Sequence, residues 1–191
     1  GLQDAVLEHL PVGDADKAER REQNLKLLEI SVKESPEYVR NARQLGMEHF
    51  AREEYRKAIP WFEMYLQSGT GGPLDRSETL VHLGRSRAKV GLQEEAIADF
   101  DLAMAEAPIR KEIYYHKAIA LIAGARPDLA IPVLEKGLSI PISEKPDFHL
   151  NVDRVWDGSY LTEALDFCCK TVEEHRKSLR GPCTQDQHRG T

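Results

Sequence analysis

The sequence lacks the features that mark membrane, secreted and nucleic-acid-binding proteins. Its 191 residues contain no apolar run near the roughly 20 residues that cross a bilayer, and the N-terminus lacks the basic-then-apolar order of a signal peptide. The 26 lysines and arginines are outnumbered by 32 aspartates and glutamates, so the net charge is −6 and a general phosphate-binding surface is not expected. We therefore expect a cytoplasmic protein with neither a membrane nor a nucleic-acid partner.

Cysteine is also scarce. The three cysteines, Cys168, Cys169 and Cys183, provide neither an even disulfide framework nor a paired C-x-x-C zinc spacing, so reduced structural thiols are expected. The chain begins with Gly1 instead of methionine. This start suggests a segment of a longer protein, although a tag remnant or methionine removal would look the same.

What the sequence does contain is helical periodicity with almost no strand-like alternation. Apolar residues at helical spacing predict helices at 16–33 and 36–51, and after a short break a third helix that ends at 67. The same spacing predicts further helices at 77–90, 93–106, 110–124, 127–139 and 159–179. The apolar stripe of the helix at 16–33 consists of Leu25, Leu27, Leu28 and Ile30. Ser35 and Pro36 fit an N-cap and a first helical position, and "SGTGGPLDR" (68–76) predicts a loop. Residues 1–15 should be irregular and 180–191 a flexible tail.

Two short motifs recur along these helices. Ala58, Ala96 and Ala130 lie 38 and then 34 residues apart, and each is followed four residues later by a large apolar residue. Gly46 and Gly84 precede the first two, with Ala118 in the third unit. Small residues at these positions allow two helices to approach to about 8–10 Å.

A unit of about 34 residues with these motifs resembles the tetratricopeptide repeat, abbreviated TPR. The sequence thus predicts an all-α, TPR-like solenoid of about three helix-turn-helix repeats over residues 16–179, with capping helices at 16–33 and 159–179. The four extra residues of the first interval are assigned to the loop at 68–76. Pro60 and Pro132 fall within second helices, which we expect to start late or bend, whereas the helix with Ala98 should not.

Further segments lie outside the repeat motifs: His9, "ERREQNLKLLE" before Pro36, "APIRKE" (107–112) followed by two tyrosines, and Trp156-Asp157. Together they resemble the repeat-bearing C-terminal region of some bacterial and phage family 2 glycosyltransferases, over roughly residues 7–175. The resemblance implies a non-catalytic region that serves dimerisation, acceptor positioning or protein interaction. It also implies a parent enzyme that uses a divalent metal and a nucleotide sugar, with His9 as a weak candidate for its metal or phosphate site.

Within the segment itself, the candidate chemical groups have structural explanations. Asp14-Ala15-Asp16 has the D-x-D form of a glycosyltransferase metal site, but it precedes a helix, where aspartate more often caps the N-terminus. Asp99 and Asp101 flank Phe100 within a helix and should face solvent. The histidines of the first helices lie one per repeat without ligand spacing: His49, His82 and His116. We therefore expect neither a catalytic residue nor a cofactor here, and enzymatic activity of a parent protein stays open.

The most promising surface is the concave face of the array, which the first helix of each pair should form. By register it should carry Arg40, Arg43, Met47, Phe50, Val81, Arg85, Lys89, Tyr115, Ile119 and Ile122. This set is basic at one end and apolar at the other. It suits an acidic extended peptide or the chain's own partner domain, because arginine forms forked hydrogen bonds with carboxylates; a solvated charged face is the alternative.

Chaperone-binding repeats clamp a C-terminal carboxylate with lysine and asparagine. Met47 and Arg85 stand where asparagine would be needed, so that function is not expected. Two functions stay open. The chain is either the non-catalytic TPR region of a family 2-like glycosyltransferase or a stand-alone TPR adaptor for a peptide or protein partner, and a homodimer is compatible with both.

Overall fold

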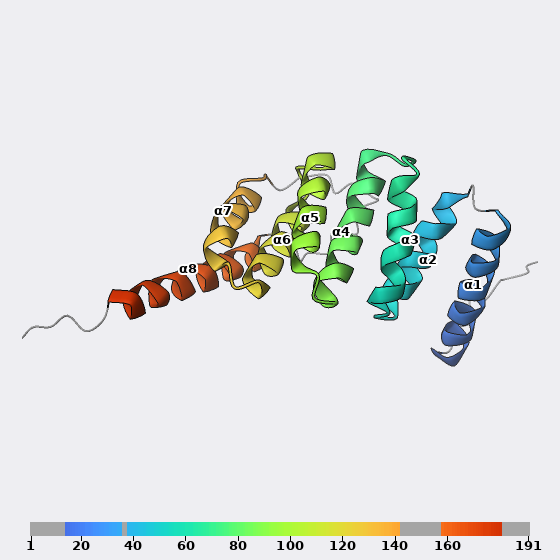
Figure 1. The fold of residues 1–191 in the computed structure, drawn as a ribbon, viewed down its shortest axis with the longest axis horizontal. Coiled ribbons are helices and arrows are strands. Elements are labelled where there is room, and N and C mark those ends of the chain that lie inside the picture. Colours follow the sequence, from blue (N-terminus) through green and yellow to red (C-terminus); the bar gives the residue numbers. More distant parts are fainter. Residues whose placement is uncertain (1–13, 36–37, 142–157, 181–191) are drawn as a thin grey trace, which may run out of the picture.

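The computed structural model describes residues 14–35, 38–141 and 158–180. These parts form eight helices and no strand: α1 (Asp14–Glu34), α2 (Val39–Ala51), α3 (Tyr55–Gln67), α4 (Pro73–Lys89), α5 (Gln93–Glu106), α6 (Lys111–Ala123), α7 (Pro127–Leu138) and α8 (Ser159–Arg180). The helices follow one another in a single row from α1 to α8 (Figure 1). Three hairpins, α2 with α3, α4 with α5 and α6 with α7, stack between the end helices. The fold is the expected all-α TPR solenoid.

The three hairpins close with the same turn. Each turn has three residues between its helices, and the middle one has a positive φ: Glu53 at 60°, Gly91 at 89° and Ala125 at 58°. In each turn the amide after this residue donates to a carbonyl five residues earlier, as Leu92 N does to Arg87 O at 2.9 Å. This is the Schellman arrangement, which satisfies the last carbonyls of the first helix and reverses the chain.

The small residues lie where the helices of a hairpin cross. A Cβ atom added to Gly46 would lie 2.7 Å from Phe62 Cε1, and one added to Gly84 would lie 2.9 Å from Phe100 Cε1. Both phenylalanine rings are fully buried. The rings occupy the space left by the missing side chains, so the repeat motifs are packing constraints, as the sequence indicated.

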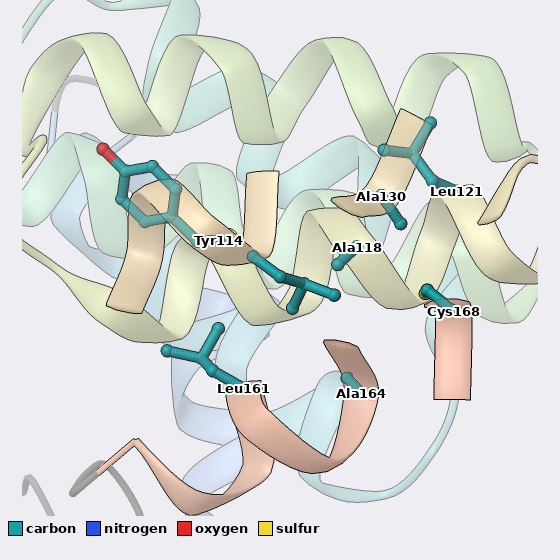
Figure 2. Packing of buried hydrophobic residues seen from close by; sticks show 8 residues of the cluster. Tyr114, Ala118, Leu121, Ala130, Leu161, Ala164 and Cys168 are labelled. Carbon is teal, nitrogen blue, oxygen red and sulfur yellow. The ribbon is translucent and has the colours of Figure 1, made fainter. Parts of the chain in front are cut away.

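The end helices cover the apolar ends of the array. On α8, Leu161, Ala164 and Cys168 pack against Tyr114, Ala118, Leu121 and Ala130 (Figure 2). On α1, Leu25 and Val32 form a cluster with Leu45 and the partly buried Leu28 and Trp61. The prediction that Leu27 and Ile30 also belong to the buried stripe of α1 is wrong, because both side chains are exposed.

Three local predictions are also wrong. The helix α2 begins at Val39 with Tyr38 as its N-cap, so Ser35 is not the cap. The loop before α4 covers only 68–72, because Pro73 starts the helix at the position where a missing N–H has no cost. The four extra residues therefore lengthen α4 to 17 residues, against 13 in α2 and α6, and do not lie in the loop.

The prolines do not delay their helices. Pro60 is the sixth residue of α3 and Pro132 is the sixth of α7, and Ala98 has the same place in α5. The late start is thus wrong. Both prolines are exposed, so the carbonyl that each leaves without an amide donor lies on the outer side of its helix. A bend at these residues stays a prediction.

Candidate functional site

We use the name first-helix face for the side of the array lined by α2, α4 and α6, and second-helix face for the side lined by α3, α5 and α7. The predicted binding residues all belong to the first helices, but they fall into three groups. Arg43 is used within the fold, several apolar residues belong to the core, and the rest are available to a partner.

Arg43 ties α2 to α4. Its Nη2 lies 2.7 Å from Glu78 Oε2, and its Nε donates to Thr79 Oγ1 at 3.0 Å. The side chain is largely buried. Arg43 therefore stabilises the stacking of two repeats, which leaves little of its guanidinium for a ligand.

The apolar members are mostly interior. Met47 and Phe50 pack against the buried cluster of Ala58, Phe62 and Leu83. Val81 is only 4% exposed, so its placement on the open face was wrong. Ile122 packs against the cluster beneath α8. Phe50 also contacts the guanidinium of Arg85.

Arg85, in the C-terminal half of α4, is the polar centre of this face. Its guanidinium carbon lies over the Phe50 ring, 4.8 Å from the centroid. The residue is half-buried, and within the described ranges no carboxylate forms an ion pair with it. Burial lowers the pKa of Arg85, and Tyr55 opposes this shift only in part. A desolvated cation without an anion is costly, so this position is not explained by stability.

Further rings pack around the Phe50 ring that lies under Arg85. Phe50 meets His82 edge to face at a centroid distance of 4.8 Å and Tyr55 at 5.5 Å. Burial lowers the pKa of His82, and it lowers the pKa of His116 to about 3, with smaller contributions from Arg85 and His82. His82 Nδ1 donates to Glu78 O at 2.9 Å. Both imidazoles are therefore neutral at pH 7, and Arg85 supplies the charge at this point of the face.

From the sequence, the two histidines were explained by the repeat period alone and were given no role in binding. His82 and His116 lie 34 positions apart and occupy equivalent places beside Arg85, whereas His49 pairs with Glu54 at 2.7 Å in the first hairpin. The equal spacing of His82 and His116 was a signal that they share a face.

The remaining members are accessible. Arg40 and Lys89 are exposed, and no ion pair is formed by either among the residues that the structure covers. Toward the other end, Ile119 is 41% exposed, and the half-buried Tyr115 meets the Tyr160 ring of α8 at 6.0 Å. The face is thus basic along α2 and α4 and apolar along α6 and α8. Tyr160 was missed because its helix lies outside the repeat pattern.

The side of α4 that faces the second helices is built differently, because its arginine is paired with two carboxylates. Arg87 Nη1 donates to Asp99 Oδ1 at 2.6 Å and Nη2 to Glu63 Oε1 at 2.5 Å. Asp99 was predicted to face solvent, and this is wrong: it is buried, and burial raises its pKa to about 6 although Arg87 opposes the shift. A shallow hollow of about 290 Å³ lies over this cluster, bordered by Leu66 and Leu102.

A larger hollow of about 750 Å³ lies between α1 and α3, with Trp61 and Pro60 in its wall. Its charged rim is largely paired within the chain, since Arg52 bonds Glu22 at 2.9 Å and Lys57 bonds Glu54 at 3.2 Å. The first of these ion pairs connects the cap helix α1 to the turn that follows α2.

Other candidates add no chemistry. No three acidic, histidine or cysteine side chains that could hold a metal ion come together in the ranges 14–35, 38–141 and 158–180, and none of the helices there could cross a membrane. His9, Trp156-Asp157, Cys183 and the tail from 181 lie outside the described residues. The D-x-D pair falls in the first turn of α1.

Comparisons with known proteins bear on the fold. No family model matches the chain, and no curated protein sequence matches it. Among solved structures, the Sgt2 TPR domain from Aspergillus fumigatus superposes with a TM-score of 0.59 at 19% identity, covering 80% of this chain and 90% of that one. MamA MSR-1 gives 0.58 at 21% identity, over 65% of this chain and 69% of that one.

A third structure, described as a TPR2B-domain:pHsp70 complex of yeast Sti1, gives a TM-score of 0.57 at 20% identity, over 70% of this chain and 97% of that one. At such identities the likeness concerns the arrangement of the helices. Together with the repeat motifs, the identical turns and the glycine contacts, it shows that the chain has the fold of a tetratricopeptide-repeat domain.

Proposed function

We propose that the chain is a protein-interaction module that holds an extended segment of a partner protein along its first-helix face. The observation that carries this proposal is Arg85, a half-buried cation that no described carboxylate neutralises. Partly exposed Ile119 and the unpaired Arg40 and Lys89 continue the same surface. Arg87, which points from α4 toward the second helices, is instead paired with Glu63 and Asp99.

The similar structures support this proposal only in general terms. One of them is described as a complex of a TPR domain, and none of the three is described as a glycosyltransferase. The link to a family 2-like sugar-transfer protein, with its dimerisation or acceptor-positioning role, therefore still depends on the sequence resemblance alone. A stand-alone adaptor fits the same surface equally well.

The test is a selection of random decapeptides displayed on phage against the immobilised chain. Synthetic copies of the strongest binders are then titrated into the ¹³C-methyl-labelled chain. We expect the largest NMR shifts at Ile119, on the first-helix face, and small shifts at Leu102 on the second-helix face. Shifts centred on Leu102, or a selection without specific binders, would contradict the proposal.

A further inference from the structure

We infer that the partner segment presents a carboxylate side chain to Arg85 and a bulky apolar side chain, about three residues away, to Ile119. This inference rests on the proposed function, because it specifies which segment the first-helix face accepts. The basic half of the face would bind the acidic residue of the partner segment, and the apolar half would bind its bulky apolar residue.

The first step is the choice of anion. Arg85 lies over the Phe50 ring, and the nearby imidazoles of His82 and His116 are neutral, so the half-buried charge that a bound group meets there is the single guanidinium of Arg85, with the exposed Lys89 one turn further along α4. A carboxylate carries one negative charge and matches the two parallel N–H groups of a guanidinium. A phosphate monoester carries about −1.5 to −2 at pH 7 and would leave charge uncompensated in this half-buried place. The surroundings of Arg85 therefore favour aspartate or glutamate.

The second step is the neighbouring position. Ile119 lies 34 residues after Arg85, at the equivalent place on α6, and α4 contacts α6 directly. Helices in contact have axes about 8–10 Å apart. A polyproline-type segment rises about 3.1 Å per residue and returns to the same side every third residue. A carboxylate on Arg85 thus places the side chain three residues away over α6.

The third step is the chemistry of that neighbour. Ile119 is 41% exposed, and the tyrosine pair of Tyr115 and Tyr160 lies on the side toward α8. A leucine-sized side chain that covers this area gains burial of roughly 25 cal/mol per Å² of apolar surface. Arg40, in the first turn of α2, and Lys89, the last residue of α4, are exposed cations in a chain of net charge −6, so each would attract acidic residues beyond the central one.

The experiment uses the decapeptides from the phage selection as fluorescein-labelled synthetic peptides, with binding measured by fluorescence polarisation. We expect the selected sequences to share an acidic residue with a large apolar residue three positions away. Replacing that acid by its amide should weaken binding to the wild-type chain about 10-fold or more, since hydrogen bonds to charged groups are the strong ones. Replacing it by phosphoserine should not improve binding.

Variants of the chain identify the partner of the acid. Arg85→Met should bind acid and amide peptides equally, and Arg85→Lys should keep part of the difference, because lysine retains the charge and loses the fork. Arg56→Met is the matched control, since Arg56 is an exposed arginine of α3; its affinities should equal those of the wild type. Ile119→Glu should weaken the peptides with a leucine three positions away and have less effect on their alanine versions.

The outcomes distinguish peptide binding to the first-helix face from recognition of an acidic residue by Arg85. Selected peptides that shift Ile119 in the NMR test but show no acid preference would overturn this inference and leave the proposed function intact. The same holds if acid and amide peptides still differ on Arg85→Met, or if phosphoserine binds more tightly. Peptides that bind elsewhere would contradict both. Circular dichroism of each variant shows whether a lost affinity reflects an unfolded chain.

Discussion

Arg85 and Arg87 lie two positions apart on α4, yet they have opposite electrostatic surroundings. Arg87 points toward the second helices, where Glu63 and Asp99 accept hydrogen bonds from both of its terminal nitrogens. Burial alone would lower the pKa of Arg87, but these carboxylates outweigh it and the net shift is upward. Arg85 points toward the first helices, and burial lowers its pKa without an opposing carboxylate.

The difference shows how one helix serves two purposes. The cation of Arg87 joins α3, α4 and α5, so it connects two repeats and belongs to the fold. The cation of Arg85 carries a desolvation cost that no described carboxylate offsets, although its guanidinium lies over the Phe50 ring. Residues that lower stability and form no compensating structural contact often belong to binding sites. Each of the following experiments compares these two sides of α4.

The largest effect is expected from Arg87→Met. The substitution keeps most of the side-chain length and leaves Asp99 buried without its cation. Removing one partner of a buried ion pair costs about 3–5 kcal/mol. Urea unfolding followed by circular dichroism should show this decrease in the free energy of unfolding, and the exposed Arg56→Met should change it by less than about 0.5 kcal/mol. A loss below about 1 kcal/mol would place Arg87 among ordinary surface arginines.

A second substitution at Asp99 sharpens this result. If the cost of Arg87→Met arises from an uncompensated carboxylate, adding Asp99→Leu should recover about 2–3 kcal/mol, because apolar replacements of buried pairs are often neutral. The comparison is a double-mutant cycle on the free energy of unfolding. Equal stability of the single and double variants would show that lost packing, and not the buried charge, causes the effect.

These paired charges were only partly accessible to sequence reasoning. The repeats followed from Gly46 and Gly84, since a backbone crossing tolerates only a small residue, and this requirement leaves a fixed spacing. The same spacing gives the angular position of Asp99 around α5, but it does not give the side chains of other helices that lie next to Asp99. Its partner Arg87 lies 12 residues away on another helix. Exposure was therefore predicted where an ion pair is found.

The candidate site shows the same limit. Arg43 and Arg85 both follow the register of the first helices, and the sequence treated them alike. The structure distinguishes them, because Arg43 forms an ion pair with Glu78, whereas no described carboxylate pairs with Arg85. The start of α4 was missed for a different reason. Pro73 favours both a loop and a first helical turn, so composition alone could not locate the four extra residues.

The two sides of α4 should also differ in their response to pH. On the first-helix face the pKa of His116 falls from 6.5 to about 3, so below pH 6.5 the unfolded chain binds a proton that the folded chain does not. Stability then decreases as the pH falls. On the other side the pKa of Asp99 rises from 3.8 to about 6, so the folded chain binds the extra proton, and this group adds stability as the pH falls through that range.

The corresponding variants should change the pH profile in opposite directions. His116→Phe keeps a ring next to Phe100 and should reduce the loss of stability between pH 7 and 5 by about 1–2 kcal/mol. Asp99→Asn should make that loss steeper, because it removes the opposing contribution. Urea unfolding at several pH values measures both slopes. Parallel profiles for the wild type and His116→Phe would show that the imidazole titrates as it does in the unfolded chain.

The smallest change in stability is expected from Arg85→Met, and its sign is the opposite of that for Arg87→Met. Removing a desolvated cation that has no described carboxylate partner should raise the free energy of unfolding by about 0.5–1 kcal/mol, net of the lost cation–π contact with Phe50, as substitutions in binding sites often do. Methionine also keeps an aliphatic contact with the Phe50 ring. Urea unfolding at pH 7, with Arg56→Met as reference, gives the sign. A loss above about 1 kcal/mol would mean that Arg85 stabilises the array as Arg87 does, and the contrast between the two arginines, with the binding role it supports, would fail.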